Sequence, residues 1–150
     1  MDLILWRHAD AEDGTLDLQR ALTRKGEKQA MHMAQWLSAH LPSHTRIVVS
    51  PALRAQQTAR ALARAFETVP ALAPGAPYTN VLSAANWPQG HGAVVVVGHQ
   101  PTLGQVAALL LSGEPAFWTI KKGAIFWLTH RSRAAEPQVA LRAALSPELL

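Results

Sequence analysis

Two arginines and two histidines stand where three short apolar runs of the sequence end. They are Arg7 and His8 after the first run, Arg54 just beyond the second, and His99 after the third. Arginine presents a planar fork of donors that suits phosphate oxygens, and a histidine ring can attack phosphorus or donate a hydrogen bond. The four residue types together indicate phosphoryl chemistry.

Arg54 gives this interpretation further weight because of its place in a predicted helix. The first turn of a helix carries the positive end of its dipole, where an acidic residue is the stabilising choice. An arginine there gains most when an anion lies in front of it, and helix N-termini bind phosphate well. A phosphoryl group held between Arg7 and Arg54 would leave one histidine to attack phosphorus and the other to bond an equatorial oxygen. Because this arrangement supplies positioning and charge stabilisation, we expect no metal and no cofactor.

The elements that must position these residues follow from the apolar pattern. Continuous apolar runs predict buried strands at 2–6, 46–50, 93–98 and 123–130, with an edge strand at 139–145. We expect a helix from the N-cap Thr23 to about His40, and another with Ser50 as N-cap and Pro51 as first residue. The apolar face of this second helix carries Ala55, Ala59, Leu62 and Phe66.

A third helix is predicted from Pro101 to Ser112, with Gly113 as its C-cap. We expect the Pro-, Gly- and Ala-rich stretch 69–92 to be loop, with a short strand near Tyr78 and a short helical turn. Strands that alternate with helices predict a three-layer α/β/α sandwich around a mostly parallel mixed sheet. Since ligands bind at the carboxyl ends of such strands, the three strand ends should meet at one edge.

Composition narrows the class of protein. The chain has 150 residues, no cysteine, no internal repeat and a formal net charge of +4, so we expect a single domain over residues 1–150. The lack of cysteine excludes disulfides, thiolate nucleophiles and cysteine zinc sites, and fits a reducing cytoplasm. The sequence shows no signal peptide, no apolar run long enough for a bilayer and no aromatic-basic module. We expect a cytoplasmic monomer without a membrane or nucleic-acid partner.

Four segments of the chain resemble the histidine phosphatase superfamily, and within it the small phosphohistidine phosphatases of the SixA type. They are "RHADAE" at 7–12, "LTRKG" at 22–26, "SPALRAQQTA" at 50–59 and "VVGHQPTLG" at 96–104. Weaker echoes are "KGAIFWL" from Lys122 and the terminal "LSPELL". The resemblance covers almost the whole chain in the family's order. It implies a phosphoglycerate mutase-like fold, minimal without a large lid insertion, and a metal-independent phosphatase.

The resemblance also implies a role for each of the four residues. His8 would be the nucleophile that becomes phosphorylated through Nε2, with its other ring nitrogen held by a backbone carbonyl. Arg7 and Arg54 would clamp the phosphoryl oxygens, and His99 would stabilise the transferring group. The family pattern is Arg-His-Gly, so Ala9 is a small departure. The implied substrate is the phosphohistidine of a phosphorelay or phosphotransfer protein.

The predicted site has no residue that is clearly assigned as the general acid. Larger relatives carry an acidic residue on an inserted segment, but 69–92 contains no Asp or Glu. Asp17 matches an acidic position of the SixA group and is the first candidate, followed by Asp10 and Glu12. A histidine that leaves as neutral imidazole needs little acid help, whereas an alkoxide gains roughly 10²–10⁴-fold from it. Arg20 is expected to assist the substrate, to brace Asp17 or to form a surface ion pair.

Other functions stay open at this point. They are a small-molecule phosphomonoesterase of the same fold, a non-catalytic module that binds phosphoryl groups, and a metallohydrolase using His8, Asp10, Glu12 and His99. The metallohydrolase is disfavoured because two arginines would repel a cation.

Three features outside this set have a structural and a functional interpretation. His32, Trp36 and His40 share one helix face, which fits a metal or partner site or simply a partly exposed face. The pair Lys121–Lys122 would attract an acidic partner domain or form a solvated turn. Trp87 falls in the loop expected to border the pocket.

Overall fold

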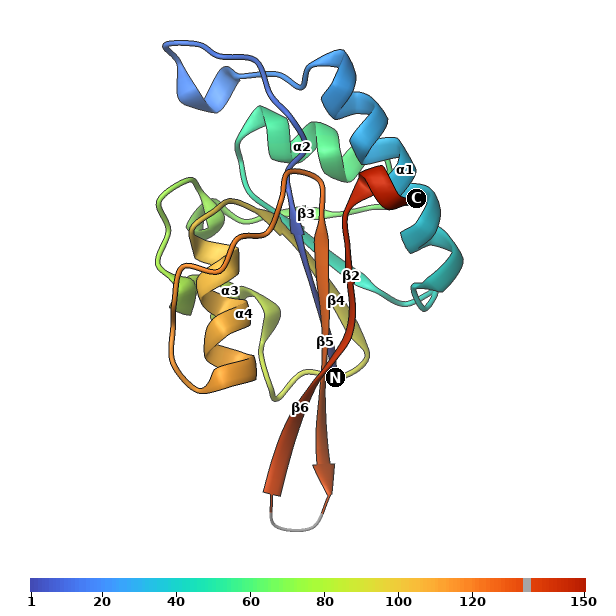
Figure 1. The fold of residues 1–150 in the computed structure, drawn as a ribbon, viewed down its shortest axis with the longest axis vertical. Coiled ribbons are helices and arrows are strands. Elements are labelled where there is room, and N and C mark those ends of the chain that lie inside the picture. Colours follow the sequence, from blue (N-terminus) through green and yellow to red (C-terminus); the bar gives the residue numbers. More distant parts are fainter. Residues whose placement is uncertain (134–135) are drawn as a thin grey trace.

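A computed structural model describes residues 1–133 and 136–150, with side-chain detail outside 132–137 (Figure 1). Within that part of the chain, six strands form one sheet in the order β3-β2-β4-β1-β5-β6. The strands are β1 (Asp2–Arg7), β2 (Arg46–Val49), β3 (Glu67–Thr68), β4 (Ala93–Gly98), β5 (Ile125–Arg133) and β6 (Glu136–Leu145). The first four in this order run parallel, whereas β5 is antiparallel to both of its neighbours. The predicted mixed, mostly parallel sheet is confirmed.

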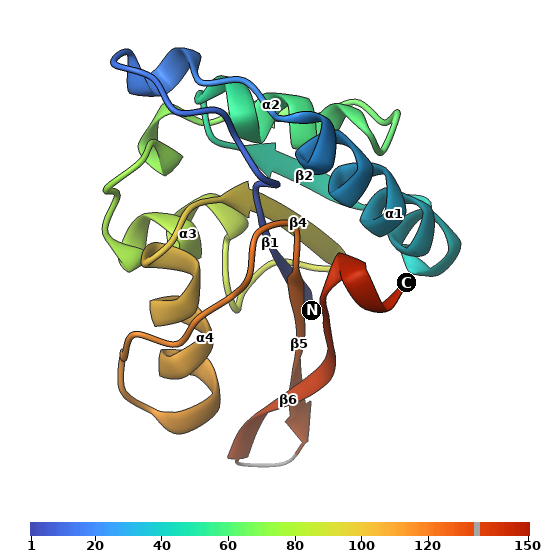
Figure 2. The ribbon, with the colours of Figure 1, turned by 45° about the horizontal axis from the view of Figure 1, so that its top comes forward.

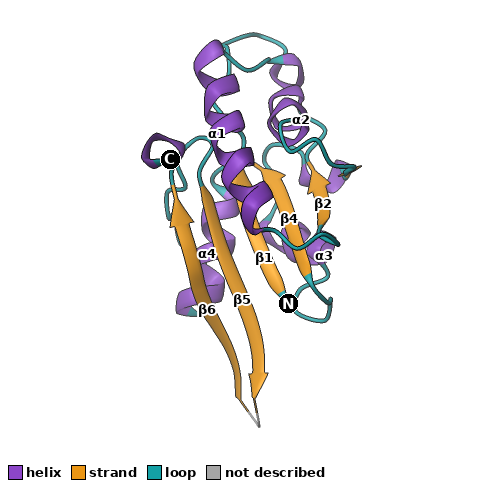
Figure 3. Ribbon diagram, turned by 90° about the vertical axis from the view of Figure 1, so that its right-hand side faces the viewer, coloured by secondary structure: helices purple, strands orange, loops and turns teal. Residues whose placement is uncertain are grey.

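Helices cover both faces of the sheet. They are α1 (Arg24–His40), α2 (Leu53–Arg60), α3 (Tyr78–Ala85) and α4 (Thr102–Ser112). Short 3-10 turns lie at 17–19, 70–72 and 147–149. Figures 2 and 3 show α1 and α2 on one face and α3 and α4 on the other, which gives the three-layer α/β/α sandwich. None of the described helices is both long and apolar enough to span a membrane.

The central strands are buried on both faces because helices lie against each. Along β1, Ile4 and Trp6 pack with α1 and α2, whereas Leu3 and Leu5 pack with α3 and α4. All six residues of β4 are buried. In such a core, each large-to-small substitution costs about 2–5 kcal/mol. The strands therefore hold their own carboxyl ends in fixed positions.

One predicted helix begins as expected, and another begins later than expected. Thr23 caps α1 as expected, because its Oγ1 accepts from the Gly26 N–H at 3.0 Å. Helix α2 starts at Leu53, so the expected cap at Ser50 is wrong. The backbone of Ala52 is still extended there, and the Ser50 hydroxyl is occupied by His99, a residue far away in the sequence.

The C-terminal part of the predicted second helix is also wrong. Helix α2 ends at Arg60, and Ala63 adopts a positive φ of 52°. Bonds from the 61, 62 and 63 amides to carbonyls three residues earlier tighten the chain instead of continuing the helix. Leu62 is nevertheless buried in the core, and Phe66 packs against this core.

The stretch 69–92 is more ordered than a loop. Helix α3 begins at Tyr78, where we expected a short strand, and its residues Val81 and Ala85 are buried one turn apart. The two-residue strand β3 before it was not predicted. At the other end of the chain, the two predicted C-terminal strands are confirmed, but β5 continues beside β6 to Arg133, beyond its pairing with β1.

Candidate active site

The three strand ends meet at one edge of the sheet. Strands β1 and β4 pair in parallel with Arg7 opposite Gly98, so the next residues, His8 and His99, lie side by side. Their ring centroids are 5.1 Å apart, with planes tilted by 53°. Ser50, at the end of β2, donates its backbone N–H to the Val97 carbonyl at 3.0 Å. The structure thus brings together segments that are far apart in the sequence.

His8 is held as a neutral ring with one free nitrogen. Its Nδ1 lies 2.8 Å from the Ala9 carbonyl oxygen. Because a carbonyl only accepts, Nδ1 carries the proton and Nε2 keeps its lone pair. Burial, together with the charges of Arg54 and Arg7, lowers the pKa of His8 to about 4. At neutral pH this ring therefore has a free Nε2 lone pair and needs no prior deprotonation before it could attack an electrophile.

His99 is oriented by Ser50. The Ser50 Oγ lies 2.7 Å from His99 Nε2 and accepts from the Ala52 N–H at 3.2 Å. The Ser50 hydroxyl can donate its own hydrogen to His99 Nε2, and the ring then carries its proton on Nδ1. Burial, followed by the charges of His8 and Arg54, lowers the pKa of His99 to about 3. His99 is therefore a neutral hydrogen-bond donor at neutral pH.

The two arginines are anchored by part of their guanidinium groups. Arg7 donates through Nη1 to the Ile120 carbonyl at 2.9 Å, and Arg54 donates through Nη1 to the Asp17 carbonyl at 2.7 Å. Within the described residues, three buried nitrogens have no hydrogen-bond partner: Arg7 Nε, Arg54 Nε and His99 Nδ1. Buried polar atoms are nearly always bonded, so three donors on these side chains point to an anion-binding site.

Asp17 bridges Arg20 and Arg54. Its Oδ1 lies 3.1 Å from Arg20 Nη1, and its Oδ2 lies 3.2 Å from Arg54 Nη2. The hydrogen bonds from Arg20 and then Arg54 lower the pKa of Asp17, the opposite of what a general acid requires. Arg20 also donates to the Glu12 carbonyl at 2.7 Å. Of the roles expected for Arg20, this geometry fits both the bracing of Asp17 and a surface ion pair, because the Asp17 side chain is exposed.

The other two acidic candidates lie in different surroundings. Asp10 accepts from Lys122 Nζ at 2.8 Å and from Thr23 Oγ1 at 2.7 Å, and these bonds lower the pKa of Asp10. A side chain at Gly26 would collide with the Asp10 carbonyl, which explains the glycine in "LTRKG". Asp10 thus ties the loop after β1 to the start of α1, while Glu12 is exposed.

Sequence reasoning missed two hydroxyl groups at this edge. One is Ser50, which we interpreted as a helix cap. The other is Thr58, whose Oγ1 accepts from the Ala9 N–H at 3.0 Å and donates to the Arg54 carbonyl at 2.7 Å. The sequence feature that could have identified Thr58 is its spacing of four residues from Arg54, which puts both side chains on one face of α2. Thr58 ties the residue after His8 to the helix that carries Arg54.

The aromatic helix face does not join the site. Trp36 stacks on His40 with ring centroids 4.1 Å apart and packs edge-on against Trp127 at 6.1 Å. In the described part of the chain, no three histidine or carboxylate side chains are grouped closely enough to hold a metal ion. Trp36 and His40 thus form a structural cluster with Trp127, whereas His32 is exposed and makes none of these ring contacts.

Trp87 lies far from the predicted pocket. Its ring packs edge-on against His130 at 5.5 Å, and the His130 N–H donates to the Met1 carbonyl at 2.8 Å. Met1 precedes β1, whereas His8 follows it. The expectation that Trp87 borders the pocket is wrong, because α3 returns the chain to the amino-terminal ends of the strands.

Known proteins share both this sequence and this fold. The model of the histidine phosphatase superfamily (branch 1) matches residues 3–75. The phosphohistidine phosphatase SixA of Escherichia coli (strain K12) is 34% identical over 132 residues, which cover 79% of this chain and 81% of that protein. A structure of the protein histidine phosphatase SixA complexed with tungstate matches with a TM-score of 0.80 and 28% identity, covering 99% of each chain.

A second solved structure, of a SixA-type protein from Nakamurella multipartitia, has a TM-score of 0.82 and 25% identity, covering 97% of this chain and 95% of that one. The coverage leaves no room for a large lid insertion, as expected. This chain therefore belongs to the histidine phosphatase superfamily, as a phosphatase of the SixA type.

Proposed function

We propose that this protein removes the phosphoryl group from a histidine of a phosphorelay or phosphotransfer protein, through a phosphorylated His8. The observation that carries the proposal is a neutral, buried His8 beside three buried donors, on Arg7, Arg54 and His99, that have no partner among the described residues. Such donors suit the oxygens of a tetrahedral anion. In support, the similar SixA structure holds tungstate, a tetrahedral oxyanion, and the Escherichia coli relative is a phosphohistidine phosphatase.

In the first step, Nε2 of His8 attacks phosphorus in line with the departing nitrogen of the substrate histidine. The N–P bond to the substrate breaks as the N–P bond to His8 forms. A substrate ring protonated on its other nitrogen leaves as neutral imidazole. Arg7, Arg54 and the Nδ1–H of His99 bond the phosphoryl oxygens, and such charge stabilisation is usually the largest catalytic contribution.

In the second step, water attacks phosphorus and releases phosphate. The O–P bond forms as the N–P bond to His8 breaks, and a proton of the water passes to phosphate or solvent. Because the Ala9 carbonyl keeps the Nδ1 proton on the ring, His8 also leaves as neutral imidazole. The two steps share one kind of leaving group, and neither requires a protonated carboxyl group.

Asp17 fits the role of a positioning residue in this scheme better than that of a general acid. Its pairing with Arg20 and Arg54 lowers its pKa and keeps it ionised at neutral pH. An alkoxide leaving group would need a proton donor worth roughly 10²–10⁴-fold in rate. The site therefore suits phosphohistidine better than a small phosphate ester.

A panel of substrates tests the proposal. We expect kcat/KM for a phosphohistidine peptide to exceed that for the matching phosphoserine peptide and for glycerol phosphate by at least about a hundredfold, because only the esters need an acid. We expect EDTA to leave the activity unchanged. A preference for the esters would assign a phosphomonoesterase instead, and phosphate binding without turnover would assign a binding module.

The proposed setting of this reaction is a cytoplasmic encounter between a monomeric enzyme and a protein that carries phosphohistidine. Cell fractionation and light scattering test the location and the oligomeric state.

A further inference from the structure

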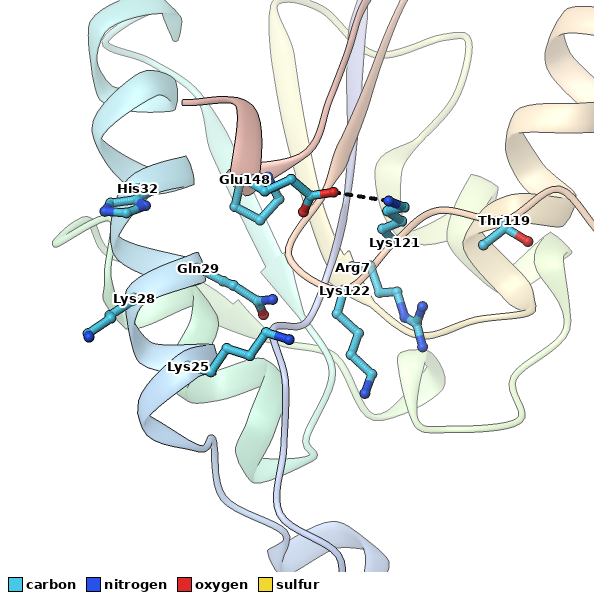
Figure 4. Close-up of a pocket in the computed structure, with 10 residues that line it drawn as sticks. Arg7, Lys25, Lys28, Gln29, His32, Thr119, Lys121, Lys122 and Glu148 are labelled. Atoms are coloured by element: carbon cyan, nitrogen blue, oxygen red, sulfur yellow. Dashed lines mark hydrogen bonds and ion pairs between the residues drawn. The ribbon is translucent and has the colours of Figure 1, made fainter.

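A basic cleft of about 820 Å³ opens next to the candidate active site. It lies between α1, the segment before β5 and the C-terminal 3-10 turn (Figure 4). Arg7 lines this cleft, whereas His8, Arg54 and His99 do not. The cleft is thus a neighbouring surface that reaches the site through one shared arginine.

Positive charge dominates the lining of the cleft. Five cationic side chains line it against one carboxylate, that of Glu148; the cations are Arg7, Lys25, Lys28, Lys121 and Lys122. Glu148 pairs with Lys121 at 3.0 Å, and Lys122 pairs with Asp10 at 2.8 Å. Among the described residues, Lys25 and Lys28 form no ion pair, and both are exposed. In Figure 4, the side chains of Lys122 and Arg7 point in a similar direction, and that of Lys25 extends toward them from α1.

Lys25 lies in the first turn of α1, near the positive end of the helix dipole, where acidic residues are stabilising. Lys28 follows three residues later, so both side chains project from the same face of the helix. An anionic partner in the cleft would offset the unfavourable position of the Lys25 charge.

The segment that borders the cleft also exposes apolar rings. Phe117 and Trp118, just before the lining residue Thr119, are 79% and 37% exposed. The Trp118 carbonyl accepts from Gln100 Nε2 at 2.8 Å, which holds this segment beside His99. Exposed aromatic rings next to spread-out lysines fit a protein surface better than a small anion, since aromatic contacts are typical of protein interfaces.

We infer that this cleft binds an acidic segment of the protein whose phosphohistidine enters the active site. The inference rests on the proposed function, because the acidic segment must adjoin the phosphohistidine that Arg7 and His8 receive. Attraction between opposite charges raises the rate of encounter and selects among partners, and salt weakens it. The cleft thereby selects phosphohistidines with acidic neighbours.

Two synthetic phosphohistidine peptides test the inference, one with glutamates on both sides of the phosphohistidine and one with glutamines at the same places. At low ionic strength, we expect kcat/KM of the wild type to be roughly tenfold higher for the glutamate peptide, and the ratio to approach one in high salt. In Lys25→Glu/Lys28→Glu the ratio should fall to about one or below. Because the ratio is taken within one variant, a general loss of activity cancels.

The double variant Arg60→Glu/Arg131→Glu is the matched control, because it changes the net charge equally at exposed positions outside the cleft. It should keep the wild-type ratio. A wild-type ratio near one, or a ratio that survives Lys25→Glu/Lys28→Glu, overturns the docking inference alone. If neither peptide nor free phosphohistidine is hydrolysed, the proposed function fails and the docking inference fails with it.

Discussion

Two clusters of polar and aromatic side chains in this molecule use similar groups in opposite ways. Around Trp127, the indole N–H donates to Asp2 at 3.1 Å, and Arg142 donates to the same carboxylate oxygen at 2.8 Å while lying 4.9 Å from the indole ring centroid. Around His8, by contrast, nitrogens of two arginines and a histidine are buried without a partner among the described residues. The polar groups around Trp127 stabilise the fold by bonding one another. The buried nitrogens around His8 lack such partners, which indicates a binding site.

The two histidines nearest these clusters show the same difference. His40 stacks on Trp36, and its Nδ1 lies 2.7 Å from the Trp36 carbonyl at an exposed position on α1. His8 makes a similar bond to a carbonyl, but it is 7% exposed and lies between two arginine charges. The surroundings, and not the hydrogen bond itself, make His8 suitable for catalysis.

A large effect is expected to distinguish the arginines of the two clusters. Arg54→Ala should lower kcat/KM for a phosphohistidine peptide by about 10²–10³-fold, because it removes a preorganised donor to the transferring group. Arg142→Ala should change kcat/KM by less than about twofold, since an exposed substitution far from the site has small effects. Steady-state kinetics measure both, with thermal melts to verify folding. Equal losses in the two variants would remove the distinction between the clusters.

The next prediction concerns the pKa of His8. We expect carbon-13 NMR to give a pKa of about 4 for His8 in the folded protein, against its ordinary 6.5. The unfolded chain then takes up the proton more readily, so His8 contributes its full stabilisation above pH 6.5 and loses it as the pH falls toward 4. As the pH falls from 6.5 toward 4, the free energy of unfolding should therefore decrease less in His8→Ala than in the wild type. A folded His8 that titrates at its ordinary pKa would contradict this account of the site.

A smaller effect is expected for the hydroxyl that orients His99. Ser50→Ala should lower kcat about tenfold with less change in KM, as is usual when a group that orients a functional imidazole is removed. Nitrogen-15 NMR should show that His99 no longer keeps its proton mainly on Nδ1. Ser112→Ala is the control, because that hydroxyl bonds the Ala108 carbonyl within α4 at 2.6 Å. An unchanged His99 tautomer in Ser50→Ala would show that Ser50 does not orient the ring.

The sequence predicted those parts of the fold whose signals are local. The apolar run of β4 and the caps Thr23 and Gly113 each depend on neighbours in the chain, and all three are confirmed. For 69–92 we expected only a short helical turn and a strand near Tyr78, and the position and length of α3 were missed because its buried residues, Val81 and Ala85, stand among prolines and glycines. A short helix with two core contacts leaves little periodicity to detect.

Long-range contacts account for the details of the site that sequence reasoning missed. Ser50 bonds His99, which is 49 residues away in the sequence, and Arg54 bonds Asp17, which is 37 residues away. The meeting of His8 and His99 was nevertheless predictable, because adjacent parallel strands deliver their ends to one edge. Which hydroxyl bonds His99 and which carboxylate bonds Arg54 depend on loop conformations that no local pattern encodes.

The most direct test of the central claim is to trap the phosphorylated enzyme. Incubation with a phosphohistidine peptide that carries radioactive phosphate, followed by an alkaline quench, should give an acid-labile label that maps to His8. His8→Ala should carry no label and lose at least about 10⁴-fold in kcat, whereas His40→Ala should keep both label and turnover. Turnover retained in His8→Ala, or a label on another residue, would contradict the assignment of His8 as the phosphoryl carrier.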